Sequence, residues 1–205
     1  MGLIKGKLLM ETRKKNYADN PSQNLNYNKY VRFLKVTLKM FGLAFGKYIP
    51  IKSGKNSIED IFNYINYNDN LSSSGQPSES QFNSIRNKGY DLVINLAPYD
   101  FVEGYLKNEE AIVTGLGMDY VHIPVVFFDP KQEDFDMFAD TMKNSTGKKI
   151  WVHCAANARA SSFIFRYRCS ILGDNPEDAI WDLREIWEPV GPWEKFIRGD
   201  AAYRG

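Results

Sequence analysis

Short apolar runs alternate with amphipathic stretches along most of the chain, from residue 57 onward. Four runs have the length and β-branched or aromatic content of buried strands: 61–67, 90–96, 120–125 and 149–153. Six stretches predict helices: 78–89, 108–117, a segment around 135–142, 159–172, a segment after Pro176, and 193–202. Strands that alternate with helices are typical of a parallel sheet covered on its faces. The pattern therefore predicts an α/β domain with a central, mainly parallel sheet flanked by helices.

Turn-forming residues separate these elements. Residues 73–77 (SSGQP) predict a turn, after which Ser78 can cap the helix that contains Phe82 and Ile85. Gly89 and Gly117 predict the ends of two helices, because glycine is favoured just beyond a helix C-terminus.

Charge divides the chain into two parts. Its 205 residues carry a formal net charge of only +1, but residues 1–55 hold 12 Lys and Arg against Glu11 and Asp19, a net of +10, which leaves −9 for residues 56–205. We therefore predict a basic N-terminal extension, 1–55, and an acidic globular domain, 56–205. The acidic domain argues against a nucleic-acid partner.

Within the extension, residues 28–49 mix apolar and basic side chains and predict a partly helical segment. Three interpretations stay open: a helix packed on the domain with its lysines in solvent, a peripheral membrane contact, or a degenerate signal or anchor segment. Lys39 interrupts the apolar stretch, which weighs against a signal segment. No run reaches the roughly 18 apolar residues of a membrane-spanning helix. A cytoplasmic protein, with membrane association as an option, is the expected localisation.

Cysteine and histidine are scarce. Cys154 and Cys169 cannot form a multi-bridge disulfide scaffold, and together with His122 and His153 they make a structural metal site improbable. No metal or cofactor is expected. Cys169 falls among aromatic residues of a predicted helix and is expected in the core, with a resolving thiol as the alternative.

Residues 150–161 (IWVHCAANARAS) carry the clearest chemical pattern. They read as an apolar strand, a loop of small residues that opens with Cys154, and a helix that begins near Arg159. The loop lies at the carboxyl end of a strand, where open α/β sheets bind ligands. Small side chains let backbone N–H groups converge, and the helix N-terminus adds a partial positive charge. The segment therefore predicts an anion-binding nest.

A thiol beside such a nest should be held as a nucleophilic thiolate near neutral pH. The planar guanidinium of Arg159 can grip two oxygens of a tetrahedral oxyanion. Cysteine, nest and arginine together suit phosphoryl transfer through a phosphocysteine intermediate. The competing structural interpretations are a buried cysteine at a strand end and a helix-surface arginine.

This stretch resembles the active-site signature of the cysteine-dependent tyrosine and dual-specificity phosphatases, in which His-Cys is followed by five residues, an Arg and a Ser or Thr. Here only four residues, Ala155, Ala156, Asn157 and Ala158, separate Cys154 from Arg159, while Ser161 stands where the hydroxyl of the signature falls.

A wider resemblance covers residues 57–198. Six motifs in order are similar to a bacterial tyrosine-phosphatase-like family with shortened Cys-to-Arg loops, distantly similar to a domain fused to β-lactamase-like hydrolases: 58–63 (IEDIFN), 74–77 (SGQP), 93–96 (VINL), 120–124 (YVHIP), 152–154 (VHC) with Arg159, and 187–189 (WEP). The resemblance implies a phosphatase-like catalytic domain of the dual-specificity type.

The resemblance also implies roles for other residues. His153 would orient the loop and favour the thiolate, and the loop residues with Ser161 would bind the phosphoryl group. Asn157 would shape the loop, since Asn tolerates the left-handed conformation. Ser161 would hydrogen-bond the thiolate or simply line the helix. A general acid is expected in the loop before the next helix, where Asp129 is the first candidate, and Glu133 and Asp134 at the start of that helix are alternatives.

The leading expectation is thus a cysteine-dependent phosphatase that hydrolyses phosphomonoesters, on a protein or a small molecule. Two alternatives remain. A rhodanese-like sulfurtransferase would carry a persulfide on Cys154, since those enzymes also use short anion-binding cysteine loops. A catalytically weak module would bind phosphate groups without turning them over.

Overall fold

A five-stranded sheet with the order β1-β2-β5-β3-β4 forms the centre of the molecule. The computed structural model describes residues 57–98 and 106–199, together with Glu11. The strands are β1 (Ile65–Asn68), β2 (Leu71–Ser74), β3 (Leu92–Asn95), β4 (Asp119–His122) and β5 (Ile150–His153). All neighbouring pairs are parallel except β1 and β2, which pair antiparallel at one edge. The predicted mainly parallel α/β sheet is confirmed.

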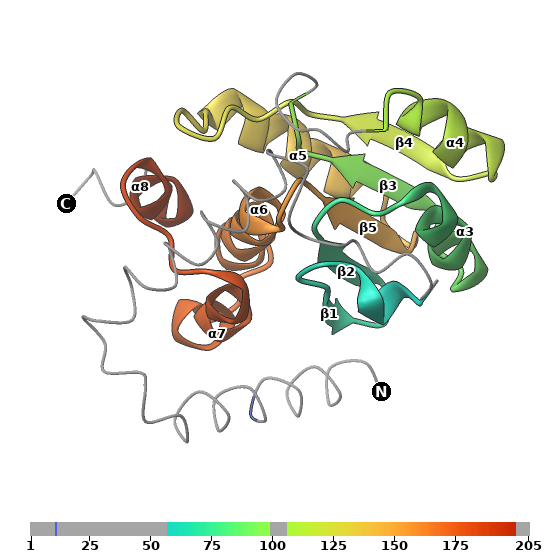
Figure 1. The fold of residues 1–205 in the computed structure, drawn as a ribbon. Helices are drawn as coiled ribbons and strands as arrows, with labels where there is room; N and C mark the ends of the chain where they lie inside the picture. The colour runs from blue at the N-terminus through green and yellow to red at the C-terminus, as the bar shows by residue number, and fades with distance from the viewer. Residues whose placement is uncertain (1–10, 12–56, 99–105, 200–205) are drawn as a thin grey trace.

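Helices cover both faces of this sheet (Figure 1). One face carries the 3₁₀ turn η1 (Ile58–Asp60), α3 (Glu79–Asn87) and α4 (Glu109–Gly115). The other carries α5 (Gln132–Asn144), α6 (Ala158–Ser170), α7 (Pro176–Ile186) and α8 (Pro192–Arg198). The six predicted helices are confirmed, with shifts at their ends. Ser78 caps α3 as expected, because its hydroxyl accepts the backbone N–H of Gln81.

The central strands β3 and β5 are mainly apolar because both of their faces are buried. On β3, Val93 packs with the α3 and α4 side, whereas Leu92 and Ile94 pack with the α5 and α6 side. On β5, Trp151 packs with the α3 and α4 side and Val152 packs with the α5 and α6 side. Successive side chains of a strand point to opposite faces, so a strand covered by helices on both sides needs apolar residues at every position.

The second strand was missed by the sequence pattern, which predicted a turn at 73–77. Ser72, Ser73 and Ser74 are instead fully buried in β2, next to the central β5. Their hydroxyl groups have partners: the Ser72 hydroxyl lies 2.5 Å from Tyr90 Oη, that of Ser73 lies 3.1 Å from Tyr67 Oη, and that of Ser74 accepts from Trp151 Nε1 at 3.1 Å. Satisfied hydroxyls can be buried at little cost, so a polar run can form a central strand.

The first strand was predicted too early, at 61–67. Residues 58–60 form a 3₁₀ turn, and Asn63 has a φ of 53°, which breaks the extended conformation before Ile65. Residues 12–56, which include the predicted helical segment 28–49, lie outside the described residues. Within the described part of the chain, no helix combines the length and apolarity required to span a membrane.

Candidate active site

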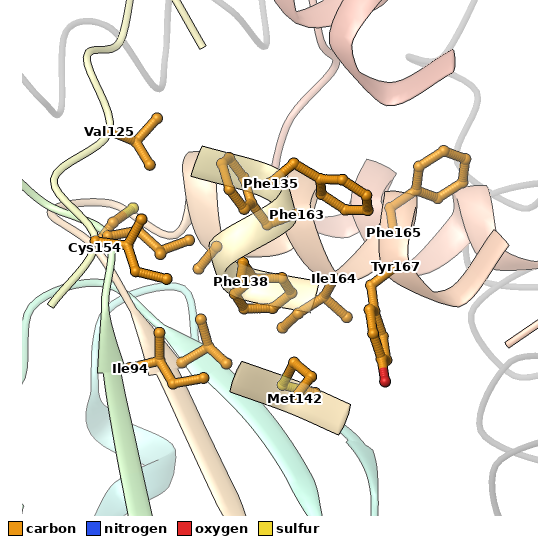
Figure 2. Close-up of a cluster of buried hydrophobic side chains, with 14 of the residues drawn as sticks. Ile94, Val125, Phe135, Phe138, Met142, Cys154, Phe163, Ile164, Phe165 and Tyr167 are labelled. Atoms are coloured by element: carbon orange, nitrogen blue, oxygen red, sulfur yellow. The ribbon is translucent and has the colours of Figure 1, made fainter. Parts of the chain in front are cut away.

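The loop between β5 and α6 occupies the carboxyl ends of the parallel strands, as predicted. Cys154 follows β5 directly and is 1% exposed, beside the apolar cluster under α5 and α6 that includes Ile94 and Val125 (Figure 2). Its backbone N–H donates to the Ser74 carbonyl of the neighbouring strand at 3.3 Å. Helix α6 begins at Ala158, so its positive N-terminal end points at the loop.

Asn157 precedes this helix in the left-handed conformation, with a φ of 68°. Its Nδ2 donates to the carbonyl of Asn63 at 2.7 Å, and Asn63 Nδ2 donates to the carbonyl of Ala156 at 2.9 Å. Both asparagines have positive φ, which Asn adopts more readily than most residues. This reciprocal pair ties the loop to the segment before β1, a contact that the sequence pattern did not predict.

Gly75, which follows β2, lies against the backbone of the Cys154 loop. A Cβ atom at this position would lie 2.9 Å from the carbonyl oxygen of Ala155 and 3.0 Å from that of Phe62. The adjacent Gln76 N–H donates to the Ala155 carbonyl at 3.2 Å. The backbone of 74–77 therefore approaches the loop of Cys154 so closely that no side chain fits between them.

Gly75→Ala is therefore expected to lower the free energy of unfolding by about 1–3 kcal/mol, since the methyl group must displace backbone atoms. Urea denaturation measures the change. Gly115→Ala is the matched control, because a Cβ there meets no atom within 4 Å and Gly115 lies inside α4. A Gly75→Ala protein as stable as the Gly115→Ala protein would contradict this close approach.

His153 is buried beneath the loop and pairs with a carboxylate. Its Nε2 lies 2.8 Å from Oε1 of Glu109, and both side chains are 0% exposed. The same Glu109 oxygen accepts from Asn95 Nδ2 at 2.9 Å and Tyr120 Oη at 3.1 Å, while Oε2 accepts from Gln76 Nε2 at 2.5 Å. Burial by itself would raise the pKa of Glu109, but the facing His153 and these donors hold it below its ordinary value.

Glu109 was not recognised as a site residue in the sequence. It stands in the first turn of α4, where an acidic residue is common for its favourable interaction with the helix dipole. Only the packing of α4 against β3 and β5 brings its carboxylate to His153, 44 positions along the chain.

Arg159 lies in the first turn of α6 and is 6% exposed. Its guanidinium carbon is 5.3 Å from the centre of the Phe127 ring. Among the described residues Arg159 forms no ion pair, and its buried Nε has no hydrogen-bond partner. A buried cation without a protein anion is costly, so its position next to the cysteine loop favours an anion-binding role.

Ser161 and Cys169 lie on the same helix. The Ser161 hydroxyl donates to the Asn157 carbonyl at 2.6 Å, so in this conformation it lines the helix instead of donating to the thiol. Cys169 is partly exposed next to the core, and burial raises the pKa of its thiol to about 11. A thiol that stays protonated at neutral pH is a poor nucleophile.

The candidate acids lie between the end of β4 and the first turn of α5. Asp129 is exposed and forms a surface ion pair with Lys131 at 3.8 Å. Asp134, in the first turn of α5, accepts the Lys131 backbone N–H at 3.4 Å, and burial raises the pKa of its carboxyl group. Both stay candidates for the general acid, and Glu133 is the adjacent alternative. In the described ranges, His, Cys, Asp and Glu side chains form no group of three or more able to hold a metal ion.

Comparison with known proteins places these features in a family. Residues 43–183 match the family described as "DSP-PTPase phosphatase fused to NAD+ Kinase". A putative phosphatase of the DUF442 group from Shewanella putrefaciens is 33% identical, with a TM-score of 0.63 over 72% of this chain and 97% of that one. The core catalytic domain of the S. cerevisiae PP-IP phosphatase SIW14 shares the fold at 13% identity, with a TM-score of 0.57 over 68% of this chain and 85% of that one.

A curated relative extends the similarity to a larger protein. The β-lactamase hydrolase-like protein of Xylella fastidiosa is 29% identical over 98 residues, which are 47% of this chain and 22% of that protein. The similarity therefore concerns about a fifth of the relative. The predicted resemblance to tyrosine-phosphatase-like proteins is confirmed, and the chain belongs to the family of dual-specificity-type phosphatase domains described as fused to NAD+ kinase.

Proposed function

We propose that the protein is a cysteine-dependent phosphomonoesterase that works through a phosphocysteine on Cys154. The observation that carries the proposal is the environment of Arg159, a buried guanidinium at the loop of Cys154 with no anionic partner among the described residues. Together with the N-terminus of α6, it provides a local positive field in an acidic domain. A phosphoryl group is the tetrahedral anion that fits this combination and the family.

In the proposed first step, Sγ of Cys154 attacks phosphorus, the P–S bond forms, and the bond from phosphorus to the ester oxygen breaks. Arg159 and the N-terminal amides of α6 hold the phosphoryl oxygens, whose charge must be stabilised during transfer. The leaving oxygen takes its proton from Asp129. In the second step the same carboxylate takes a proton from water, the water oxygen attacks phosphorus, and the P–S bond breaks to release inorganic phosphate.

The proposed substrate is a phosphomonoester of a protein or of a small molecule. Phe127 packs against Arg159, and Phe128, 81% exposed, packs edge-on against Phe127 with ring centres 5.4 Å apart. These rings offer an apolar surface beside the anion site for the body of the substrate.

Two assays on the same purified protein test the proposal. Hydrolysis of p-nitrophenyl phosphate, with a phosphoenzyme trapped by acid quench and mapped to Cys154, is the expected result. Transfer of sulfur from thiosulfate to cyanide without phosphoester hydrolysis would assign a rhodanese-like sulfurtransferase instead. If neither reaction occurs while phosphate still raises the unfolding temperature, the domain is a phosphate-binding module.

Asp129→Asn is expected to lower kcat for phenyl phosphate by about 10²–10⁴-fold, because this poor leaving group needs a proton from the enzyme. Inhibition by phosphate should be unchanged. Asp134→Asn is the matched comparison, since Asp134 lies in the first turn of α5, five residues after Asp129, and its raised pKa would also suit an acid. If the loss follows Asp134→Asn and spares Asp129→Asn, the general acid is Asp134.

A further inference from the structure

Helix α8 contacts the loop that carries the candidate acid, although it lies far from that loop in sequence. Trp193, in its first turn, is 1% exposed, and its indole Nε1 donates to the backbone carbonyl of Phe127 at 2.7 Å. This carbonyl stands two residues before Asp129 in the chain. The bond therefore fixes the loop backbone close to the proposed acid.

The ring of Phe127 extends this connection to the anion site. It lies 5.6 Å from the ring of Trp193 and 5.8 Å from that of Trp187, and it also contacts the guanidinium of Arg159 at 5.3 Å. Beyond Phe127, the Asp129 N–H donates to the Val126 carbonyl at 3.2 Å, which closes the loop into a turn. Phe127 thus connects α8, the guanidinium of Arg159 and the turn that carries Asp129.

We propose that Trp193 is a positioning residue for proton transfer. Its indole N–H holds the Phe127 carbonyl, so that the turn at 126–129 presents its carboxylate at a set place relative to Arg159. The inference rests on the proposed phosphatase function. It adds that a residue of α8, which does not touch the phosphoryl group, controls how well the leaving oxygen is protonated.

The physical reason lies in the sensitivity of proton transfer to geometry. A displacement of about 1 Å at a catalytic group can cost about 10²-fold in rate. Without the indole donor, the Phe127 carbonyl would have to find another partner, and the turn would shift with it. Binding of the phosphoryl group would be preserved, because Arg159 and the start of α6 do not depend on this hydrogen bond.

The chain offers a matched pair of variants. Trp193→Phe removes the N–H that bonds to Phe127 and keeps an aromatic ring in place. Trp187→Phe removes the same group from an equally buried tryptophan whose Nε1 has no hydrogen-bond partner among the described residues. Both indoles pack against Phe127 at similar distances, so the two changes differ chiefly in the hydrogen bond.

The test compares kcat/KM, which covers the step that releases the leaving group, on phenyl phosphate, whose leaving group is poor, and on p-nitrophenyl phosphate, whose leaving group is good. Trp193→Phe is expected to lose about 10–100-fold on phenyl phosphate and less than about 5-fold on p-nitrophenyl phosphate, with the inhibition constant for phosphate unchanged. Trp187→Phe should change neither rate by more than about 2-fold. Equal losses by both variants, or equal losses on both substrates, would overturn the positioning role.

If Trp193→Phe does not fold, Trp193→Met provides the same comparison, because methionine also lacks an N–H donor in its side chain and its flexible side chain can fill an irregular space. Faster amide hydrogen exchange at residues 126–131 than in Trp187→Phe supports the inference, and identical exchange contradicts it. Failure of the proposed function is recognised separately, since wild-type protein would then hydrolyse neither phosphate ester.

Discussion

Replacing Cys154 by serine is expected to lower kcat for p-nitrophenyl phosphate by at least about 10⁴-fold, as loss of an essential nucleophile does in other enzymes. Serine fits the site, because Cys154 is 1% exposed and the two side chains differ little in size. The hydroxyl stays protonated at neutral pH and cannot replace a thiolate as the attacking group. Steady-state kinetics measure the loss, and isothermal titration with phosphate checks that the anion site persists.

Cys169→Ser is the internal control for this experiment. Cys169 lies on α6, the helix that follows the loop, and burial raises the pKa of its thiol to about 11. It should therefore remain protonated, and its replacement should leave kcat within about 2-fold of wild type. If the Cys154→Ser protein kept a tenth or more of the activity, the nucleophile would have to be another group and the proposed mechanism would be wrong.

Glu109→Ala is expected to destabilise the fold by about 3–5 kcal/mol, because buried side-chain donors lose the acceptor that they share. Four side chains share the Glu109 carboxylate as their hydrogen-bond acceptor and would lose it: His153, Asn95, Tyr120 and Gln76. Urea denaturation at pH 7 measures the loss. Glu110→Gln is the control, because Glu110 is the exposed neighbour on the same helix and should stay within about 0.5 kcal/mol of wild type.

The pH dependence of stability gives a second test of the Glu109 carboxylate. Because the folded-state pKa of Glu109 is lowered below its ordinary 4.5, the ionised group stabilises the fold fully above that pH. The contribution is lost as the pH falls from about 4.5 through the lower folded-state value. The difference in stability between wild type and Glu109→Gln should therefore shrink over this acidic range. A difference that stays constant from pH 7 down to pH 3 would show that the pKa of Glu109 is the same in the folded and the unfolded protein, and a difference that grows would show that folding raises it.

The loop from Cys154 to Arg159 is the part of the candidate site that local sequence predicts well. An apolar strand, small residues after Cys154 and a helix containing Arg159 are consecutive in the chain, so their relative positions follow from the geometry of one strand–loop–helix unit. Asn157 adopts the left-handed conformation that its residue type favours. The strands and helices with a clear apolar period were also predicted close to their observed ends, because this period is a local property of the sequence.

The residues around the loop could not be predicted in this way. Ser72–Ser74 look like part of a turn, and only the hydroxyl partners supplied by other segments make burial of this strand favourable. Glu109 and Trp193 occupy ordinary positions in first helical turns. Their partners, His153 and Phe127, lie 44 and 66 positions away, and no local period encodes such contacts.

The uneven distribution of charge along the chain and the single Cys-to-Arg segment were enough to predict an acidic domain with an anion-binding loop, and the six short motifs were enough to identify its family. Those features depend on residue types and on contacts between near neighbours. Three contacts depend on how separate elements pack. They are the hydrogen bond of Glu109 to His153, the close approach of Gly75 to the loop of Cys154, and the hydrogen bond of Trp193 to the Phe127 carbonyl. Tertiary structure decided these, because burial removes water as a competing partner and each buried polar group must then find its partner in another segment.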